Sequence, residues 1–240
     1  MKRYILYTIL TLLTLAGCSK AETEQPHESG YGTLDMSGII IEDATRAVSA
    51  EDFTITVYDA DNSPVGSWTK SETPETVSLE AGDYTVTAHS PSLDGAAWES
   101  PYYFGSQSAT VVKDQTTPVT VRCTLANIKV AVTYSEDLQA ALSDGESYAT
   151  RITVADSWLD FENGDSRNGY FRAAETLNTM RISFTGTVDG VKENFSMEID
   201  GVKAGQFRKV ILTISSQAGD HDLGAVIESW QQDPDLEAGK

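Results

Sequence analysis

Val119-Thr120-Val121-Arg122-Cys123 alternates apolar with polar residues, and Ile128, Val130 and Val132 repeat this period of two a few residues later. Such alternation indicates β-strands that bury one face and expose the other. Cys123 falls on the same face as Val119 and Val121, so we expect a small buried side chain there, without reactivity or chemistry of its own.

The same period recurs along the chain. Further strands are expected at Phe53-Ile55-Val57, Tyr84-Val86-Ala88, 151–155, 180–187, 195–199, 210–215 and 223–227. Clusters rich in Asp, Asn, Gly and Pro separate them and indicate tight turns, for example 59–64, 80–83 and 163–165. Only 136–142 has a helical pattern. The sequence therefore predicts an all-β protein, an antiparallel β-sandwich with little helix.

The strand pattern restarts after Asp144-Gly145, and the length suits two domains of roughly 100 residues each. We place the boundary near Leu125-Ala126, with an N-terminal sandwich at 31–125 and a C-terminal sandwich with an acidic tail at 126–240. One continuous sandwich is the alternative, because no Pro- or Gly-rich linker marks the boundary.

The chain opens with Met1-Lys2-Arg3 and an apolar run from Tyr4 to Leu15, which ends in Leu15-Ala16-Gly17-Cys18. A charged start, a short apolar core and small residues at a cleavage site predict a lipoprotein signal peptide over 1–17 with acylation of Cys18. An ordinary secretory signal with a chance cysteine fits less well, because all three residues before Cys18 suit an acylation site. The polar stretch 18–30 is expected to be a flexible tether.

The net charge of −19 excludes nucleic acid as a partner, because such a charge repels phosphate backbones. Acylation of Cys18 leaves Cys123 as the one remaining cysteine, so no intramolecular disulfide is expected.

No enzyme motif is present, and the three histidines, His27, His89 and His221, lack the spacing of a metal site or a nucleophile–base pair. Acidic residues gather at 156–165, but their spacing does not match a calcium-binding loop, so we interpret them as turn residues. We therefore predict no catalysis, no cofactor and no metal.

Aromatic residues concentrate at Trp98, Tyr102 and Tyr103, between two expected strands. Exposed rings of this kind can stack on sugars, which makes these three residues a candidate ligand-binding site. They can equally cap the end of a sandwich, with the ring over the core and the polar atom in water.

The segment Leu34 to Ile41 reads as a strand and runs into Glu42-Asp43-Ala44-Thr45-Arg46-Ala47. Cleavage between Arg46 and Ala47 by an Arg-specific protease would release the lipidated leader together with this strand. The groove left behind would present unpaired backbone groups and an apolar core to a strand from another chain. In the alternative interpretation, Arg46 lies in an ordinary loop and the strand stays in place.

The lipobox at Cys18, the 44–47 segment and the stretches 79–86, 101–105 and 123–130 together resemble fimbrillin-like surface lipoproteins. They are most similar to a related lipoprotein family of unknown function from Gram-negative gut-type bacteria. The resemblance covers most of residues 30–140. It implies two transthyretin-like or immunoglobulin-like β-sandwich domains, removal of the leader strand at Arg46-Ala47, and assembly into a pilus by strand exchange.

The sequence and the resemblance together predict a non-catalytic structural or adhesive subunit, held on the outer membrane at the cell surface by the lipid on Cys18. Its partners would be other pilin-like subunits or a host or glycan surface. A glycan-binding surface lipoprotein that uses Trp98, Tyr102 and Tyr103 is the alternative. The terminal strand near 223–230 is followed by an acidic tail containing Pro234, which suits a spacer or a subunit that does not donate a strand.

Overall fold

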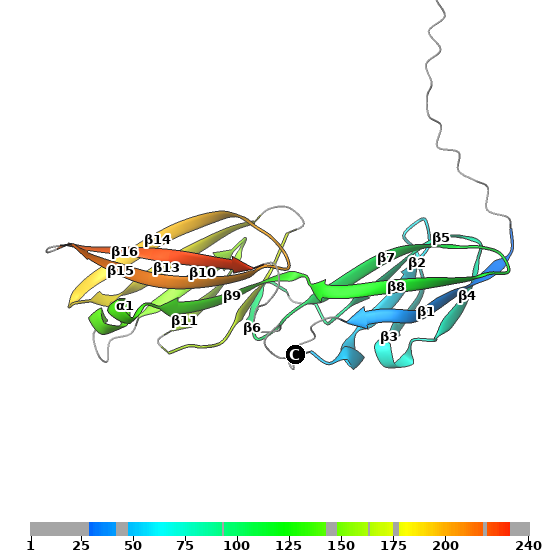
Figure 1. Ribbon diagram of the computed structural model, residues 1–240, viewed down its shortest axis with the longest axis horizontal. Coiled ribbons are helices and arrows are strands. Elements are labelled where there is room, and N and C mark those ends of the chain that lie inside the picture. Colours follow the sequence, from blue (N-terminus) through cyan, green and yellow to red (C-terminus); the bar gives the residue numbers. More distant parts are fainter. Residues whose placement is uncertain are drawn as a thin grey trace, which may run out of the picture.

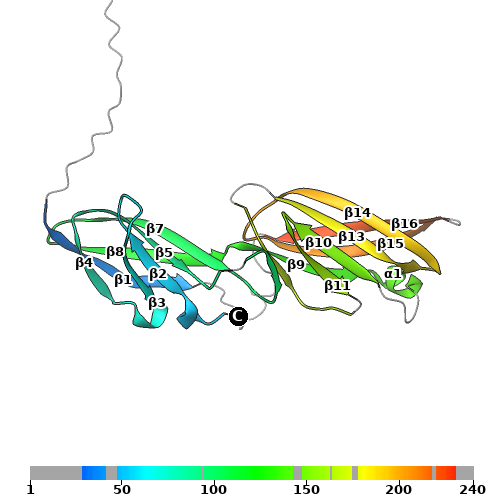
Figure 2. The ribbon, with the colours of Figure 1, turned by 180° about the vertical axis from the view of Figure 1, so that it is seen from behind.

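A computed structural model describes residues 29–41, 48–92, 94–142, 148–162, 164–174, 178–217 and 220–230. Two β-sheet lobes lie end to end in it (Figure 1). The view from behind shows the same elongated arrangement (Figure 2). Within the described part of the chain, no helix combines the length and the apolar character that a membrane crossing requires.

Among the described residues, the N-terminal lobe contains seven paired strands. They are β1 (Tyr31–Ile41), β2 (Thr54–Tyr58), β3 (Pro64–Thr69), β4 (Thr76–Glu80), β5 (Gly82–His89), β7 (Tyr103–Val111) and β8 (Thr116–Leu125), with short 3-10 helices η1 (Ala50–Asp52) and η2 (Lys70–Glu72). Their order is β3-β2-β5-β7-β8-β1-β4. Strands β7 and β8 pair only at Tyr103↔Leu125 and Phe104↔Thr124, and there the sheet divides into two layers.

The core of this lobe lies between the two layers. Phe53, Ile55 and Val57 come from one layer, and Leu34 and Val121 come from the other; all are fully buried. The alternating positions predicted to face inward on β2 and β8 therefore do so. Packing of these apolar faces supplies the main stabilising force of a sandwich without a disulfide.

The C-terminal lobe is built from two facing sheets. The first contains β10 (Ala149–Val154), β11 (Ser157–Glu162), β13 (Asn178–Val188) and β14 (Val191–Val202), and the second contains β6 (Ala96–Trp98), β9 (Asn127–Tyr134), β12 (Gly169–Arg172), β15 (Phe207–Gln217) and β16 (Asp220–Trp230). Their orders are β11-β10-β13-β14 and β16-β15-β9-β12-β6. A second apolar cluster fills the space between them and includes Ile128, Val130, Ile152, Ile182 and Phe184.

One α-helix, α1 (Glu136–Ala141), follows β9, where the sequence predicts a short helix. The Ser135 hydroxyl accepts a hydrogen bond from the Leu138 N–H at 3.3 Å and so caps the first turn. Leu138 is fully buried and fixes the helix to the C-terminal core.

Two features of the turns follow from the sequence. The Asp59 carboxylate accepts hydrogen bonds from the N–H groups of Asp61 and Ser63, and Asn62 adopts φ 58°. This is a structural Asx-type turn. Asp189 and Gly190 join β13 to β14 with φ values of 50° and 79°, as a tight two-residue hairpin requires.

The predicted all-β fold class is confirmed. The antiparallel pattern holds for most neighbouring strands, but β1 runs parallel to β8 and β9 runs parallel to β15. Parallel neighbours need a connection that crosses from one end of the sheet to the other, and such a connection leaves no local sequence signal.

The segment between β5 and β7 crosses from one lobe to the other. Its strand β6 pairs with β12 in the C-terminal lobe through Ala96↔Phe171, Ala97↔Tyr170 and Trp98↔Gly169. The boundary expected near 125–126 falls at the junction of β8 with β9, but β6 precedes it in the chain and belongs to the other lobe's sheet.

Candidate functional site

Strand β1 occupies an interior position in the N-terminal lobe. Its first half pairs antiparallel with β4 from Tyr31↔Glu80 to Asp35↔Thr76. It also pairs parallel with β8 over Thr33–Asp35 and Gly38–Ile41. It runs from the far end of the N-terminal lobe towards the C-terminal lobe (Figure 1). Its removal would therefore expose the edge of β8 and the edge of β4 together.

Three apolar side chains of β1 enter the core. Leu34 is 0% exposed, Met36 1% and Ile39 8%, and all three belong to the N-terminal core cluster. At roughly 1.5–3 kcal/mol for each side chain taken from water, they make β1 a substantial part of the lobe's stability. The strand is thus a structural component of the sandwich, and in the chain it directly follows the segment predicted to be a signal peptide and tether.

The pairing of β1 changes partway along the strand. The Asp35 carboxylate accepts a hydrogen bond from the Ser37 N–H at 2.9 Å, and this bond lowers the pKa of Asp35. The Met36 N–H donates to the Glu75 carbonyl at 2.8 Å, and the register with β8 shifts between Asp35 and Gly38. This irregularity is where β1 leaves β4 and continues along β8 alone.

Gly38 permits the close approach of β1 to β8. A Cβ atom there would lie 2.5 Å from the carbonyl oxygen of Val119, which is backbone and cannot turn aside. Any larger residue would force the two strands apart, so this position is specific for glycine on steric grounds.

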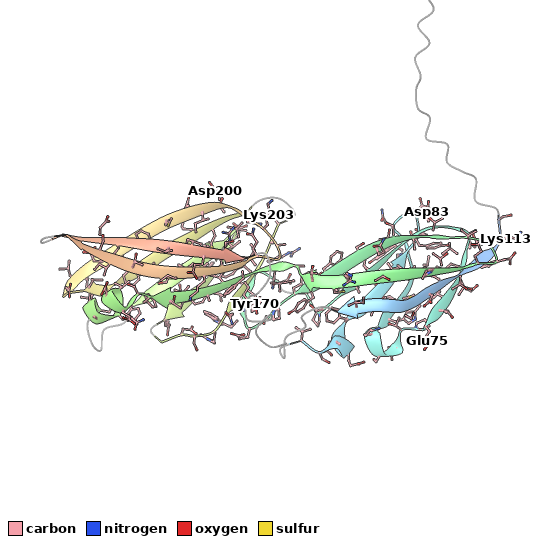
Figure 3. The ribbon with its side chains drawn as sticks, viewed as in Figure 1. Glu75, Asp83, Lys113, Tyr170, Asp200 and Lys203 are labelled. Carbon is pink, nitrogen blue, oxygen red and sulfur yellow. The ribbon has the colours of Figure 1, made fainter. Side chains whose placement is uncertain are left out.

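The start of β1 is held by the turn between β7 and β8. The Asp114 N–H donates to the Tyr31 carbonyl at 2.9 Å. A Cβ atom at Gly30 would lie 2.8 Å from the Lys113 side chain. Figure 3 shows Lys113 at the far end of the lobe, where the chain enters β1, and Glu75 at its lower edge.

The residues predicted for lipidation and processing, Cys18, Arg46 and Ala47, lie outside the described residues. The structure describes the chain up to Ile41 and again from Val48, and the expected cleavage position lies between these two residues.

The three aromatic candidates belong to different surroundings. Trp98 lies on β6 and packs on the C-terminal core, with its ring 4.6 Å from that of Phe161 in an edge-to-face contact. The guanidinium of Arg167 covers its face at 4.1 Å. Cation and ring stabilise each other in this arrangement, which leaves that face of Trp98 unavailable for a sugar.

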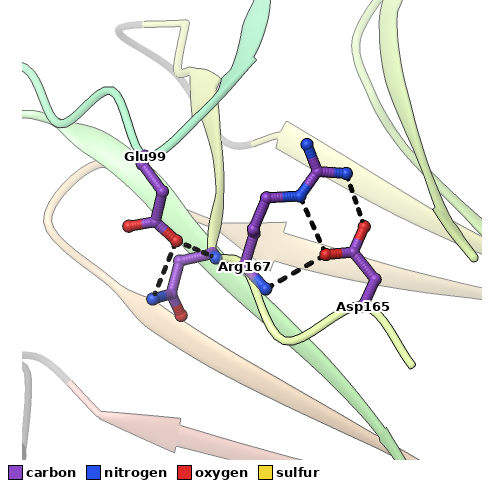
Figure 4. Close-up of polar contacts among 4 residues, drawn as sticks. Glu99, Asp165 and Arg167 are labelled. Carbon is purple, nitrogen blue, oxygen red and sulfur yellow. Dashed lines mark hydrogen bonds and ion pairs between the residues drawn. The ribbon is translucent and has the colours of Figure 1, made fainter.

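Polar contacts fix the loop that carries Arg167 (Figure 4). Arg167 donates to Asp165 through Nε at 2.9 Å and Nη2 at 2.8 Å. These hydrogen bonds from Arg167 lower the pKa of the Asp165 carboxyl. The Glu99 carboxylate accepts a hydrogen bond from the Asn168 N–H and so ties β6 to the same loop.

Tyr103 points into the N-terminal core, is 2% exposed and lies 6.3 Å from the ring of Phe53. Tyr102 is partly buried, 6.3 Å from the ring of His89, and burial raises its pKa. The structure therefore does not gather Trp98, Tyr102 and Tyr103 into one sugar-binding surface. It corrects the expectation for Tyr103, because alternation in β7 turns that side chain inward.

Cys123 is fully buried, and its thiol donates to the Ala88 carbonyl at 3.5 Å. Burial raises its pKa to about 11. The thiol is therefore protonated at neutral pH, in agreement with the structural role predicted for it.

The described residues contain no group of three or more His, Cys, Asp or Glu side chains placed to hold a metal ion. His89 has its Nδ1 2.8 Å from the Ser90 carbonyl oxygen. Asp160 is paired with Arg151, and Asp165 with Arg167. Two of the acidic residues in the 156–165 region are therefore already paired with arginine side chains.

One exposed aromatic residue that sequence reasoning missed is Trp158 on β11, which is 55% exposed. Ser157-Trp158-Leu159-Asp160-Phe161-Glu162 alternates, with Leu159 and Phe161 on the inner face. Because Leu159 and Phe161 face the core, the alternation places Trp158 on the outer face of the sheet. This alternation was the signal available in the sequence.

The sequence matches a family model, that of a domain of unknown function named DUF4493, over residues 32–237. A comparison with curated proteins finds no match. Similar solved structures include a fimbrial assembly protein from Parabacteroides distasonis, 11% identical with a TM-score of 0.47, which covers 84% of this chain and 99% of that chain.

Two others are a fimbrial anchor protein from Porphyromonas gingivalis and a protein from Bacteroides eggerthii provisionally assigned to cell adhesion. The first is 10% identical with a TM-score of 0.42 and covers 84% of this chain and 97% of that chain. The second is 10% identical with a TM-score of 0.47 and covers 86% of this chain and 97% of that chain.

Proposed function

We propose, from the premise that this chain belongs to the DUF4493 family of domains of unknown function, that it is a non-catalytic surface subunit of a fimbria or adhesive assembly. It would be exported as a lipoprotein, acylated at Cys18 and held on the outer membrane. Cleavage between Arg46 and Ala47 would then open it to strand exchange with another pilin-like subunit. The observation that carries the proposal is the interior position of β1 between β4 and β8.

The place of β1 in the chain supports a removable strand. It is the first strand of the described residues, it follows directly on the predicted tether, and the Arg46-Ala47 bond lies between its end at Ile41 and the start of η1 at Ala50. One cut there would separate β1 from the rest of the chain covalently, while every later strand would stay connected.

The groove left by β1 would select for an incoming strand. The positions of Leu34, Met36 and Ile39 would become apolar depressions, and β8 and β4 would offer unpaired backbone N–H and C=O groups. An added strand would gain affinity from the backbone hydrogen bonds and register from its alternate side chains. The close contact at Gly38 adds the requirement for a small residue opposite Val119.

An acceptor role suits this chain better than a donor role. Strand β16 is paired with β15 along its whole length, from Phe207↔Trp230 to Gln217↔Asp220. Donation of β16 would break that entire ladder, whereas release of β1 would follow from one proteolytic cut.

The N-terminus of the mature protein in its native cells tests the proposal. We expect mass spectrometry to find Ala47 as the N-terminus in high-mass assemblies and acylated Cys18 in the uncleaved precursor. An Arg46→Lys variant is the matched control, because it keeps the positive charge and removes the Arg-specific site. Assemblies that contain intact acylated Cys18, or that form equally well from Arg46→Lys, would rule out release of the strand.

A further inference from the structure

The outer face of the sheet β11-β10-β13-β14 presents an ordered set of side chains. The register aligns Trp158 with Thr153, Thr153 with Arg181, and Arg181 with Glu198, so that one row crosses all four strands. The next row is aligned in the same way and consists of Asp160, Arg151, Ser183 and Ser196. These eight residues are called the Trp158 face.

Trp158 differs from Trp98 in its surroundings. It is 55% exposed, and the guanidinium of Arg151 lies over its ring at 5.4 Å from the centroid. A tryptophan held in this way by a neighbouring side chain presents a large apolar surface to water without contributing to the core. Tryptophan is enriched at binding interfaces, because its ring offers a large apolar surface and its N–H group offers a polar contact.

The two arginines of the face are already compensated. Arg151 donates to both oxygens of Asp160, through Nε at 2.7 Å and Nη2 at 2.8 Å. Arg181 donates to Glu198 through Nε at 2.8 Å. The hydrogen bond from Arg151 lowers the pKa of Asp160, so that pair stays charged at neutral pH. The charges of the two rows cancel, although the chain as a whole carries −19.

A shallow hollow of about 430 Å³ lies beside the part of the row of Trp158 that runs from β10 to β14, and Trp158 itself does not line it. Thr153, Thr179, Arg181 and Glu198 contribute to its lining. Thr179 on β13 donates to Asp200 on the edge strand β14 at 2.6 Å, which adds one more fixed polar pair to the sheet. Figure 3 shows Asp200 at the upper edge of the C-terminal lobe.

We propose that the Trp158 face binds a neutral oligosaccharide. Trp158 would stack, through the ring face turned away from Arg151, on the C–H face of one pyranose ring, while Thr153 and the Arg181–Glu198 pair would exchange hydrogen bonds with hydroxyl groups along the oligosaccharide. The balanced charge of the face matches an uncharged ligand. A sugar also suits it better than a protein, because a protein interface needs a contiguous apolar centre, and these two rows offer one aromatic ring among polar groups.

This site is separate from strand exchange. The Trp158 face lies on the C-terminal lobe, whereas β1 and its groove belong to the N-terminal lobe. Loss of one activity would therefore leave the other intact, and each is tested by its own experiment.

The test measures binding of the full mature chain to a panel of neutral oligosaccharides from mannan, galactan, β-glucan and xylan, by isothermal titration calorimetry and tryptophan fluorescence. We expect at least one of these oligosaccharides to bind. In Trp158→Ala the Kd should increase about tenfold or more, because one well-formed aromatic stack is lost. Trp158→Phe should retain part of the affinity. Phe104→Ala removes a 40% exposed ring from the other lobe and should bind as the wild type does.

Thermal unfolding separates loss of binding from loss of fold, because an exposed side chain should leave the midpoint of Trp158→Ala close to that of the wild type. Failure of the wild type to bind any member of the panel at millimolar concentration would overturn the proposal. Equal binding by Trp158→Ala would also overturn it.

Discussion

Cys123 illustrates how burial determines the chemistry of a residue. Its side chain is fully buried in the N-terminal core, and its pKa is raised from the ordinary 9.0 to about 11. Because folding favours the protonated thiol, this group stabilises the protein fully below pH 9. The contribution is lost as the pH rises from about 9 to about 11.

We therefore expect Cys123→Ala to lose less stability than the wild type as the pH rises into the alkaline range. The wild type should lose roughly 2 kcal/mol more free energy of unfolding than the variant between pH 8 and pH 11. Urea unfolding at a series of pH values measures the difference. Tyr134, whose pKa burial raises to about 12, is present in both proteins and so contributes equally. Parallel pH profiles for the two proteins would contradict the expectation.

Two tryptophans should differ sharply in their contribution to stability. Trp98 packs on Phe161 and under Arg167, so Trp98→Ala removes a ring from the edge of the core, and we expect a loss of about 2–4 kcal/mol. Trp158→Ala should change the stability by less than about 0.5 kcal/mol, because that ring is 55% exposed. Urea midpoints measure both effects. Similar losses in the two variants would show that Trp158 also packs in the core.

At the scale of secondary-structure elements, the sequence predicts the strands in which apolar residues facing the core alternate with polar residues facing solvent. Strands β2, β5, β8 and β9 and helix α1 all appear where that pattern or a helical pattern indicated them. The strands that the pattern did not reveal have weaker signals. Strand β3 is an edge strand without a fully buried position, and β6 is only the three residues Ala96–Trp98.

The parallel pairing of β1 with β8 illustrates a second limit of the sequence. The residues of 34–41 indicate a strand, but its neighbours are set by contacts between distant parts of the chain, such as Ile39 with Val121 in the register. The same limit applies to the candidate ligand site. The aromatic cluster at 98–103 is local in sequence, but β6 and β7 belong to different lobes and separate its members.

The chain can be cleaved after Arg46 and the original strand β1 removed in urea. A synthetic peptide of residues 31–41 should then bind to the cleaved chain. We expect it to restore the N-terminal lobe on dilution, because it supplies Leu34, Met36 and Ile39 to the core. A peptide with Gly38→Val should fail or bind far more weakly, since its Cβ would meet the Val119 carbonyl at 2.5 Å. Fluorescence anisotropy of labelled peptides measures the binding. Equal affinity of the two peptides would show that the groove does not hold β1 in its observed register.

For the whole molecule, the decisive feature is that the described residues form two apolar clusters, one in each lobe. Strand β8 passes into β9 with only Ala126 between them, and β6 pairs with β12 across the junction. Neither connection merges the two cores. We infer that the lobes behave as separate cooperative units, which is the two-domain organisation predicted from the restart of the strand pattern.

Matched variants of the two cores test this inference. Phe53→Ala and Phe184→Ala each remove a buried ring, at about 3–5 kcal/mol, from the N-terminal and the C-terminal core respectively. In hydrogen exchange measured by mass spectrometry, Phe53→Ala should reduce protection in β2, β5 and β8 and leave β13 unchanged, and Phe184→Ala should do the reverse. Strand β6 is the sharpest indicator, because its hydrogen bonds are made with β12, so its protection should follow Phe184→Ala although it lies between β5 and β7 in the chain. Loss of protection throughout both lobes in either variant would mean that the molecule unfolds as one unit.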